Sequence, residues 1–401
     1  MDRHDWRQAI HELPVFDTHT HLNMPGVPIP AQTFWDIAHY FWFLQELWSV
    51  GYPREAMDLP EGERIEAFVM AFNAARNTHW RRIVTRISHD LYAVPLVDTA
   101  GVCTVGAVRE LDAGVRARAK ESSWPKSVVD GLNIRSIAVN SLRDTPFPDL
   151  PGVAVAVPVW EDLEAWLARL VAAGDKTYVA AEARAAIGDR VAVLKGMGIR
   201  GMRVPGEVFE QVGKPAVALT DGGGLGERWQ AEAFLAHATF EALSDHGMFA
   251  QLFLGIERDV TDRTSMAVND PRRVTNVYPL FERYACDFEL VMGSPQNNMD
   301  AAQAARIYPN AHVGGLWWYN FRKSTYDHAL QVRVESVPAS KSAIVASDAR
   351  CIEWCYGKIL LVKWVLADFL CDQVDRGWLS EDDALWVARE WLHDAAARRY
   401  V

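Results

Sequence analysis

The sequence is poor in cysteine, and it lacks long apolar runs and an excess of positive charge. Its 401 residues include only five cysteines, an odd number at scattered spacings. Cys351 and Cys355 are four residues apart, which fits one helix face and not a Cys-x-x-Cys metal or redox motif. We therefore expect reduced thiols and a cytoplasmic protein.

The missing features argue against three classes of protein. No uninterrupted apolar run approaches the ~18 residues that a membrane span needs. The richest stretch, 359–371, is broken by Lys363 and Asp368 and is typical of an amphipathic helix. The charged residues 1–7 lack the apolar core of a secretory signal. A formal net charge of -11 argues against nucleic acid, although a pocket of opposite local charge can still bind a small anion. We expect neither a membrane nor a nucleic-acid partner.

The size of the chain indicates a large core with added segments. Half of the residues are hydrophobic, and 401 residues exceed the ~250 of a plain (β/α)₈ barrel. Between 31 and 126 the pattern is helical and rich in Trp, Arg and Glu, for example over 33–48, 61–76 and 108–119. We predict one barrel domain, 1–401, containing a helical insertion subdomain over 24–130 after strand one.

Short apolar runs alternate with helical stretches along the rest of the chain. Such alternation favours a parallel sheet, and eight strand-like runs favour a closed (β/α)₈ TIM barrel. After the barrel we expect two helices, 353–376 and 381–398, with Gly377 as the stop between them and Ser380 as the N-cap of the second. The predicted strands are 15–18, 134–139, 153–159, 199–204, 249–254, 288–292, 312–315 and 343–347, and helices between them include 163–173, 227–245, 301–307 and 326–334.

A His-x-His pair, His19 and His21, directly follows the first apolar strand. Residues i and i+2 of a strand point to the same face, so the two imidazoles can converge on one divalent cation. A mononuclear metallohydrolase barrel usually begins with this pattern. A pair of surface histidines is the alternative interpretation.

Asp348 and Arg350 follow the last predicted strand. Active sites of such barrels lie at the carboxyl ends of the strands, and closure places strand eight beside strand one. Asp348 can then complete a site of three protein ligands with one open position, the catalytic pattern. The alternative role for Asp348 is that of N-cap of the following helix, and the two roles can coexist. Arg350 can present a planar fork to a substrate carboxylate, and its alternative is a surface loop arginine.

Other candidates are weaker when taken alone. His39 and Tyr40 lie in an aromatic stretch, 35–42, that is typical of core. Trp317, after two glycines and predicted strand seven, fits an apolar floor of the site or plain packing equally well. Arg258, after strand five, is ambiguous by itself.

Together these motifs resemble, in order, those of the uronate (glucuronate) isomerases of the amidohydrolase superfamily, with this chain as a divergent member. The resemblance covers nearly the whole chain and is specific from about 314 onward. The motifs are His19-x-His21, His39-Tyr40, Gly-Gly-Leu-Trp-Trp-Tyr-Asn over 314–320, Ser-Asp-Ala-Arg over 347–350, Trp354-x-Tyr356-Gly357-Lys358 and the tail 376–381.

The resemblance implies a distorted (β/α)₈ barrel of the amidohydrolase type with a helical insertion after strand 1. It implies one divalent metal, with zinc as the expected ion, held by His19, His21 and Asp348. The partner would be a small-molecule sugar acid. We also expect a homo-oligomer.

The same resemblance implies roles around that metal. His39 and Arg350 would grip the carboxylate of an open-chain uronic acid, with Arg258 also in the substrate pocket. Tyr40 and Asp348 would take part in moving a proton between C1 and C2. Trp317 would line the substrate site.

Three positions depart from the family pattern. Glu161 stands where the family has an arginine, residues 202–207 offer no equal to its Asp-His pair, and Phe253 replaces a histidine. Phe253 cannot donate a hydrogen bond, ligate a metal or shuttle a proton. A lost partner in a buried site usually costs ~1–3 kcal/mol, so three such changes predict a different sugar acid or a different reaction.

Three functional interpretations remain open from the sequence. The first is an aldose–ketose isomerase of a uronate or related sugar acid. The second is a metal-dependent hydrolase of a sugar-acid lactone or an amide, which uses a metal-activated water. The third is a non-catalytic binder of acidic sugars.

Overall fold

The computed structural model defines most of the chain. It describes residues 2–22, 28–140, 150, 152–160, 162–204, 208–209, 225, 227–261, 264–317 and 320–401. Within these ranges no helix is long and apolar enough to span a bilayer. All five cysteines are buried and unpaired.

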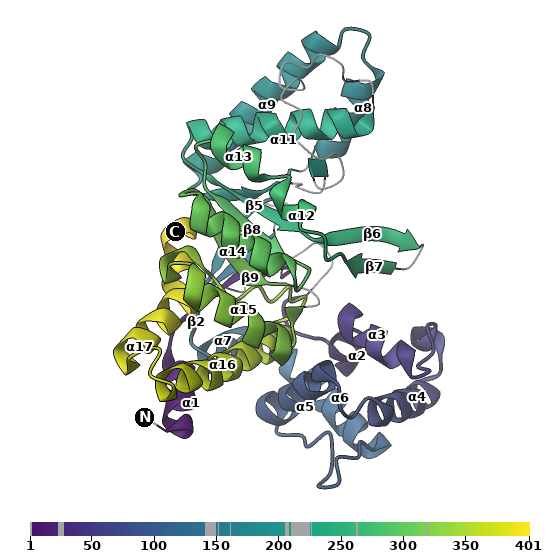
Figure 1. Cartoon of the computed structure of the whole chain (residues 1–401). Helices are drawn as coiled ribbons and strands as arrows, with labels where there is room; N and C mark the ends of the chain where they lie inside the picture. The colour runs from purple at the N-terminus through teal and green to yellow at the C-terminus, as the bar shows by residue number, and fades with distance from the viewer. Residues whose placement is uncertain are drawn as a thin grey trace.

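Two parallel sheets form the centre of the molecule. The first contains β1 (Val15–Thr20), β2 (Ile134–Val139) and β3 (Ala154–Ala156), and the second has the order β4 (Gly201–Arg203), β5 (Phe249–Leu254), β8 (Phe288–Met292) and β9 (Ala311–Leu316). An isolated parallel bridge joins Val159 to Arg203 between the sheets. With helices between the strands, the architecture is α/β and TIM-barrel-like (Figure 1).

Segment 343–347, expected as the eighth strand, makes only isolated bridges to its neighbours. Leu316 pairs with Val345, and Thr20 pairs with Ala349, both in parallel. The ladder is interrupted because the backbone N–H of Ser347 donates to the carboxylate of Asp17, at 2.8 Å, and not to a strand carbonyl. The next residue, Asp348, has a left-handed φ of 55°. The chain therefore passes β1 closely but without regular strand geometry.

Helices are the only regular secondary structure in the described chain between β1 and β2. In Figure 1 most of them form a purple-to-blue lobe beside the sheets. The predicted helix 33–48 is divided in two because Tyr40 is extended, with φ −60° and ψ 127°. The helices are α2 (Phe34–Ala38), α3 (Phe41–Ser49), α4 (Glu61–Ala74), α5 (His79–Tyr92), α6 (Val105–Arg118) and α7 (Trp124–Gly131).

The buried Glu353 ties this lobe to the rest of the molecule. It is the second residue of the long helix α16 (Ile352–Asp375), and its carboxylate accepts hydrogen bonds from Tyr92 Oη and Trp124 Nε1, both at 2.9 Å. The backbone N–H of Ala31 donates to its other oxygen at 3.0 Å. Each donor lies between β1 and β2 in the chain, so the contacts fix the lobe against the helix that follows Asp348.

Helices cover the outside of the sheets (Figure 1). The predicted last helix, 381–398, is divided by a π-helical turn, Glu390–Asp394. These helices are α1 (Arg3–Glu12), α8 (Leu163–Ala172), α9 (Lys176–Gly196), α11 (Arg228–Asp245), α12 (Arg272–Thr275), α13 (Tyr278–Arg283), α14 (Asn297–Ile307), α15 (Lys323–Ser336), α17 (Glu381–Arg389) and α18 (Ala395–Tyr400).

An antiparallel hairpin that the sequence analysis did not anticipate follows β5. It consists of β6 (Ile256–Thr261) and β7 (Thr264–Ala267), and it projects from the sheets in Figure 1. Gly255 makes the turn into it with a φ of +83°, and a Cβ there would approach Asn297 Oδ1 to 2.8 Å. Only glycine meets both conditions without strain. The hairpin carries Arg258.

Candidate metal centre and active site

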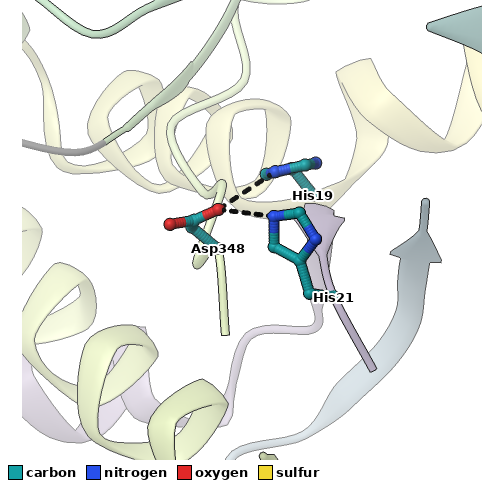
Figure 2. A group of neighbouring side chains, drawn as sticks. All are labelled: His19, His21 and Asp348. Carbon is teal, nitrogen blue, oxygen red and sulfur yellow. Dashed lines mark hydrogen bonds and ion pairs between the residues drawn. The ribbon is translucent and has the colours of Figure 1, made fainter. Parts of the chain in front are cut away.

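Three potential metal ligands converge at the carboxyl end of β1. His19 and His21 lie two residues apart, so their side chains share a face. His19 Nε2 lies 3.2 Å and His21 Nε2 3.0 Å from the same oxygen of Asp348, Oδ1 (Figure 2). One donor atom from each residue lies within 4.8 Å of the others. Two imidazoles and a carboxylate therefore face one point.

The electrostatics of this cluster fit a divalent cation. Burial lowers the pKa of His19 to about 4, which keeps its imidazole in the neutral form that binds metal. Burial opposes ionisation of Asp348, but hydrogen bonds from His19 and His21 hold the pKa of its carboxyl well below the usual value. Two imidazole nitrogens and a carboxylate suit zinc-type ions, and three protein ligands leave a position open.

Asp348 is held in a backbone conformation that L residues avoid. Its φ of 55° is one of three positive values at non-glycine residues in the described chain. Such a conformation costs about 1–3 kcal/mol and persists only where the surroundings impose it. Here the Asp348 N–H donates to the His19 carbonyl at 2.8 Å, and the His21 N–H donates to the Ala349 carbonyl at 2.8 Å. These bonds lock the carboxylate beside the imidazoles.

A cavity of about 530 Å³ opens next to the three ligands. It lies where several strands end: Arg203 is the last residue of β4, and Trp317 directly follows β9. This is the catalytic end of barrel-like folds. The lining residues are His21, Tyr40, Phe41, Trp42, Val159, Arg203, Arg258, Ser265, Trp317, Asp348 and Arg350.

Most residues singled out in the sequence meet at this cavity. Tyr40, Arg258, Trp317 and Arg350 all line it. The Tyr40 hydroxyl lies 3.3 Å from Asp348 Oδ2, and burial together with the nearby Asp348 charge raises the pKa of Tyr40 well above its usual value. Tyr40 is therefore a protonated donor next to the Asp348 carboxylate.

His39 is not among the residues that line the cavity. Its Nε2 lies 2.8 Å from the hydroxyl of Tyr52, and its ring packs 5.1 Å from that of Trp35. The extended backbone at Tyr40 turns these adjacent side chains in different directions. In this structure His39 contacts Tyr52 and Trp35, and Tyr40 contacts the candidate site.

Arg203 lines the cavity, although the sequence did not point to it as a site residue. Its guanidinium lies 4.3 Å from the ring centroid of Phe253, and that ring lies 4.5 Å from the His19 ring. One feature of the sequence could have identified Arg203 as a site residue: it is a charged residue at the end of a predicted strand. A second cavity of about 370 Å³ shares Arg203 and Arg258 with the first. The ring of Phe253 thus packs against the Arg203 guanidinium, at the position where the family pattern has a histidine.

Glu161 and two residues of the 314–320 motif, Trp318 and Tyr319, lie outside the described residues. The same holds for 205–207 of the segment after β4.

Trp42 belongs to the aromatic stretch that the sequence indicates as core, but its Nε1 donates to Asp348 Oδ2 across 3.5 Å. It therefore adds a second donor on the Tyr40 side of that carboxylate.

The fold belongs to the structural class of α/β, TIM-barrel-like proteins. No family model and no curated protein matches the sequence. Among solved structures, the uronate isomerase of Thermotoga maritima matches with a TM-score of 0.80 at 12% identity, covering 100% of this chain and 97% of that one. The uronate isomerase of Bacillus halodurans matches with a TM-score of 0.73 at 17% identity, covering 99% and 95%.

A third match has a different description. A provisionally described metal-dependent hydrolase of Lactobacillus casei has a TM-score of 0.63 at 13% identity, covering 98% of this chain and 96% of that one. Identities this low establish the fold alone. The predicted resemblance to uronate isomerases is confirmed at that level.

Proposed function

We propose that the chain is a metal-dependent aldose–ketose isomerase that acts on a uronate or a related sugar acid. The observation that carries the proposal is the convergence of His19, His21 and Asp348 at a cavity that His21, Asp348 and Arg350 line. The fold that the chain shares with uronate isomerases supports it. The volume of about 530 Å³ is within the range of small-molecule sites.

The arginines provide the means of binding an acid. Arg350 follows the metal-site carboxylate by two residues and lines the same cavity. Its planar guanidinium can bind the substrate carboxylate through two parallel hydrogen bonds. Arg203, the last residue of β4, and Arg258, on the β6–β7 hairpin, line the same cavity and add positive charge near the rest of an anionic substrate.

The reaction that we propose moves hydrogen within the substrate and needs no co-reactant. The proton on C2 is removed and returned to C1, while the hydroxyl proton of O2 passes to O1, so the aldose becomes the ketose with all atoms retained. A bound divalent metal supplies polarisation of the carbonyl oxygen. Asp348 and Tyr40 are the groups placed to take and return the protons, and general acid–base help of this kind is worth ~10²–10⁴-fold.

Several finer statements belong to the same proposal. We propose that zinc is the ion, that the strands close into an eight-stranded barrel and that residues 24–130 act as an insertion subdomain. A cytoplasmic location and a homo-oligomer complete the proposal. Free buried thiols are in keeping with that location.

A hydrolase is the second candidate. The structural match to a provisionally described metal-dependent hydrolase favours it. In that case a water activated at the site would attack a sugar-acid lactone or an amide, with Asp348 as both ligand and general base. The absence of a histidine at 253 weakens this candidate, because Phe253 cannot move a proton.

One experiment separates the candidates. Protein loaded with zinc is incubated with glucuronate, galacturonate and their lactones in H₂¹⁸O, and products are followed by NMR and mass spectrometry. We expect ketose to form from the free acid, with no ¹⁸O in the carboxylate. Incorporation of ¹⁸O during lactone opening, without ketose, would establish the hydrolase instead. Tight binding with no turnover of any compound would establish the non-catalytic binder.

A further inference from the structure

A fully buried lysine lies directly behind Tyr40. Lys358 is on α16, and its Nζ donates hydrogen bonds to the Tyr40 hydroxyl, at 2.6 Å, and to the Ser347 carbonyl. Its hydrogen-bond acceptors are thus a hydroxyl and a backbone oxygen. Both belong to residues that surround Asp348: Tyr40 contacts its carboxylate, and Ser347 precedes it in the chain.

Four aromatic rings surround the same ammonium group. Nζ lies 4.3 Å from the ring centroid of Tyr40, 4.7 Å from Phe321, 5.3 Å from Trp80 and 5.9 Å from Trp354. Ring faces attract a cation, and the effect is larger where water is excluded. The cage therefore offsets part of the cost of burying a charge, which is still several kcal/mol for an ion. An apolar residue would avoid this cost, so stability alone does not account for a lysine here.

The donor pattern gives Lys358 a specific effect on Tyr40. An ammonium group has only donors, so the Tyr40 oxygen must accept in this hydrogen bond. The phenolic proton of Tyr40 is then directed to its other neighbour. That neighbour is Asp348, whose Oδ2 and carbonyl oxygen each lie 3.3 Å away. The chain of bonds has one direction, from Lys358 through Tyr40 to Asp348.

We propose that Lys358 is a positioning residue of the active site, which acts through Tyr40 by holding its hydroxyl, with the proton outward, at Asp348. Lys358 does not line the cavity, so it does not touch the substrate. The inference rests on the proposed isomerase function. It assigns the lysine of the Trp354-x-Tyr356-Gly357-Lys358 motif a role in the chemical step and not in substrate binding.

The same helix offers a matched control. Lys363 is also buried, and its Nζ donates to three backbone carbonyls, those of His11 at 2.7 Å, Leu13 at 2.9 Å and Leu132 at 2.8 Å. None of these residues lines the cavity. Lys363→Met therefore measures the structural cost of removing a buried lysine from α16 without touching Tyr40.

The test is a double-mutant cycle with zinc-loaded protein and the sugar acid that is turned over. We expect Lys358→Met to lower kcat about 10- to 100-fold with KM nearly unchanged, as small displacements of a catalytic group do. In a Tyr40→Phe background the same substitution should lower kcat no further. Lys363→Met should lower stability and leave kcat unchanged. Equal losses from Lys358→Met in both backgrounds, or no loss in either, would overturn the proposal.

A structural measurement keeps the inference testable without turnover. A crystal structure of Lys358→Met should show the Tyr40 hydroxyl moved away from Asp348 Oδ2, whereas Lys363→Met should keep it in place. An unmoved Tyr40 refutes positioning by Lys358, whatever reaction the protein catalyses. Lys358→Gln, with a shorter uncharged side chain, serves for both measurements if the Met variant does not fold.

Discussion

The Nε2 of His21 lies 3.0 Å from Oδ1 of Asp348, although 327 residues separate them in the chain. The contact exists because the segment after Val345 runs alongside β1, where the His21 N–H donates to the Ala349 carbonyl. Parallel neighbours bring their carboxyl ends to the same edge. The candidate metal site is assembled from both ends of the chain, so it depends on the fold being complete.

The first prediction concerns the metal ligands. His19→Ala and Asp348→Asn each remove one of three donors, so we expect bound metal per chain to fall at least about tenfold, with activity falling in parallel. Elemental analysis of purified protein measures this directly. His89→Ala is the control, since that side chain is 65% exposed on α5, and it should retain metal. Full occupancy in either ligand variant would refute the ligand assignment.

The second prediction concerns Arg350. Arg350→Met removes a charged partner for the substrate carboxylate while leaving Asp348 in place, and a charge-assisted bond is worth about 1.5–3 kcal/mol. We expect affinity for sugar acids to fall about 10- to 100-fold with metal content unchanged, as measured by calorimetry. Arg376→Met, an exposed arginine at the end of α16, is the matched control. Unchanged affinity in Arg350→Met would count against the carboxylate clamp.

A third prediction follows from the position of His39. Since its Nε2 pairs with Tyr52 and it does not line the cavity, His39→Ala should weaken carboxylate binding much less than Arg350→Met does. The two variants are compared in the same calorimetric assay. If both weaken binding equally, His39 reaches the substrate in the bound state, as the family resemblance implies.

The sequence predicts the strands well where an apolar run is continuous and buried. Predicted 134–139, 249–254 and 288–292 coincide with β2, β5 and β8. It predicts the strand 343–347 less well, because the N–H of Ser347 donates to the Asp17 carboxylate and not to a carbonyl of a neighbouring strand. That bond joins residues 330 positions apart, so no local pattern encodes it.

The site shows the same division between local and distant information. The pair His19 and His21 is predictable because strand periodicity alone puts both on one face. The separation of His39 from Tyr40 is not, since it depends on a break between α2 and α3 inside a continuous apolar pattern. The role of Phe253 under Arg203 depends on contact between neighbouring strands, β4 and β5.

That contact gives a fourth prediction. Phe253→Leu removes the ring face under the Arg203 guanidinium, and a partly desolvated cation–π pair is worth about 1 kcal/mol. We expect affinity for sugar acids to fall about fivefold, with metal retained because Phe253 is not a ligand. Phe249→Leu, on the same strand but outside the cavity, serves as the control. An affinity unaffected by Phe253→Leu would mean that Arg203 does not contact the substrate.

The last prediction concerns stability in acid. Burial lowers the pKa of His79, His237 and His312 to about 4 each, against 6.5 for an unburied histidine. Between about pH 6.5 and 4 the unfolded chain binds more protons than the folded one, so the free energy of unfolding falls as the pH falls. Burial raises the pKa of Asp17 to about 6, which has the opposite effect, but it is one group against five, since burial also lowers the pKa of His19 and His39 to about 4.

His237 isolates one of these contributions. It is buried on α11, and its Nδ1 lies 2.6 Å from the Tyr284 hydroxyl, away from the metal site. His237→Gln cannot gain a proton, so the stability advantage of the unaltered chain over the variant should shrink by up to about 3 kcal/mol between pH 7 and pH 4. Urea unfolding of both proteins across this range measures the difference. A difference that stays constant would show that His237 takes up its proton without unfolding the chain, and that burial does not keep it neutral.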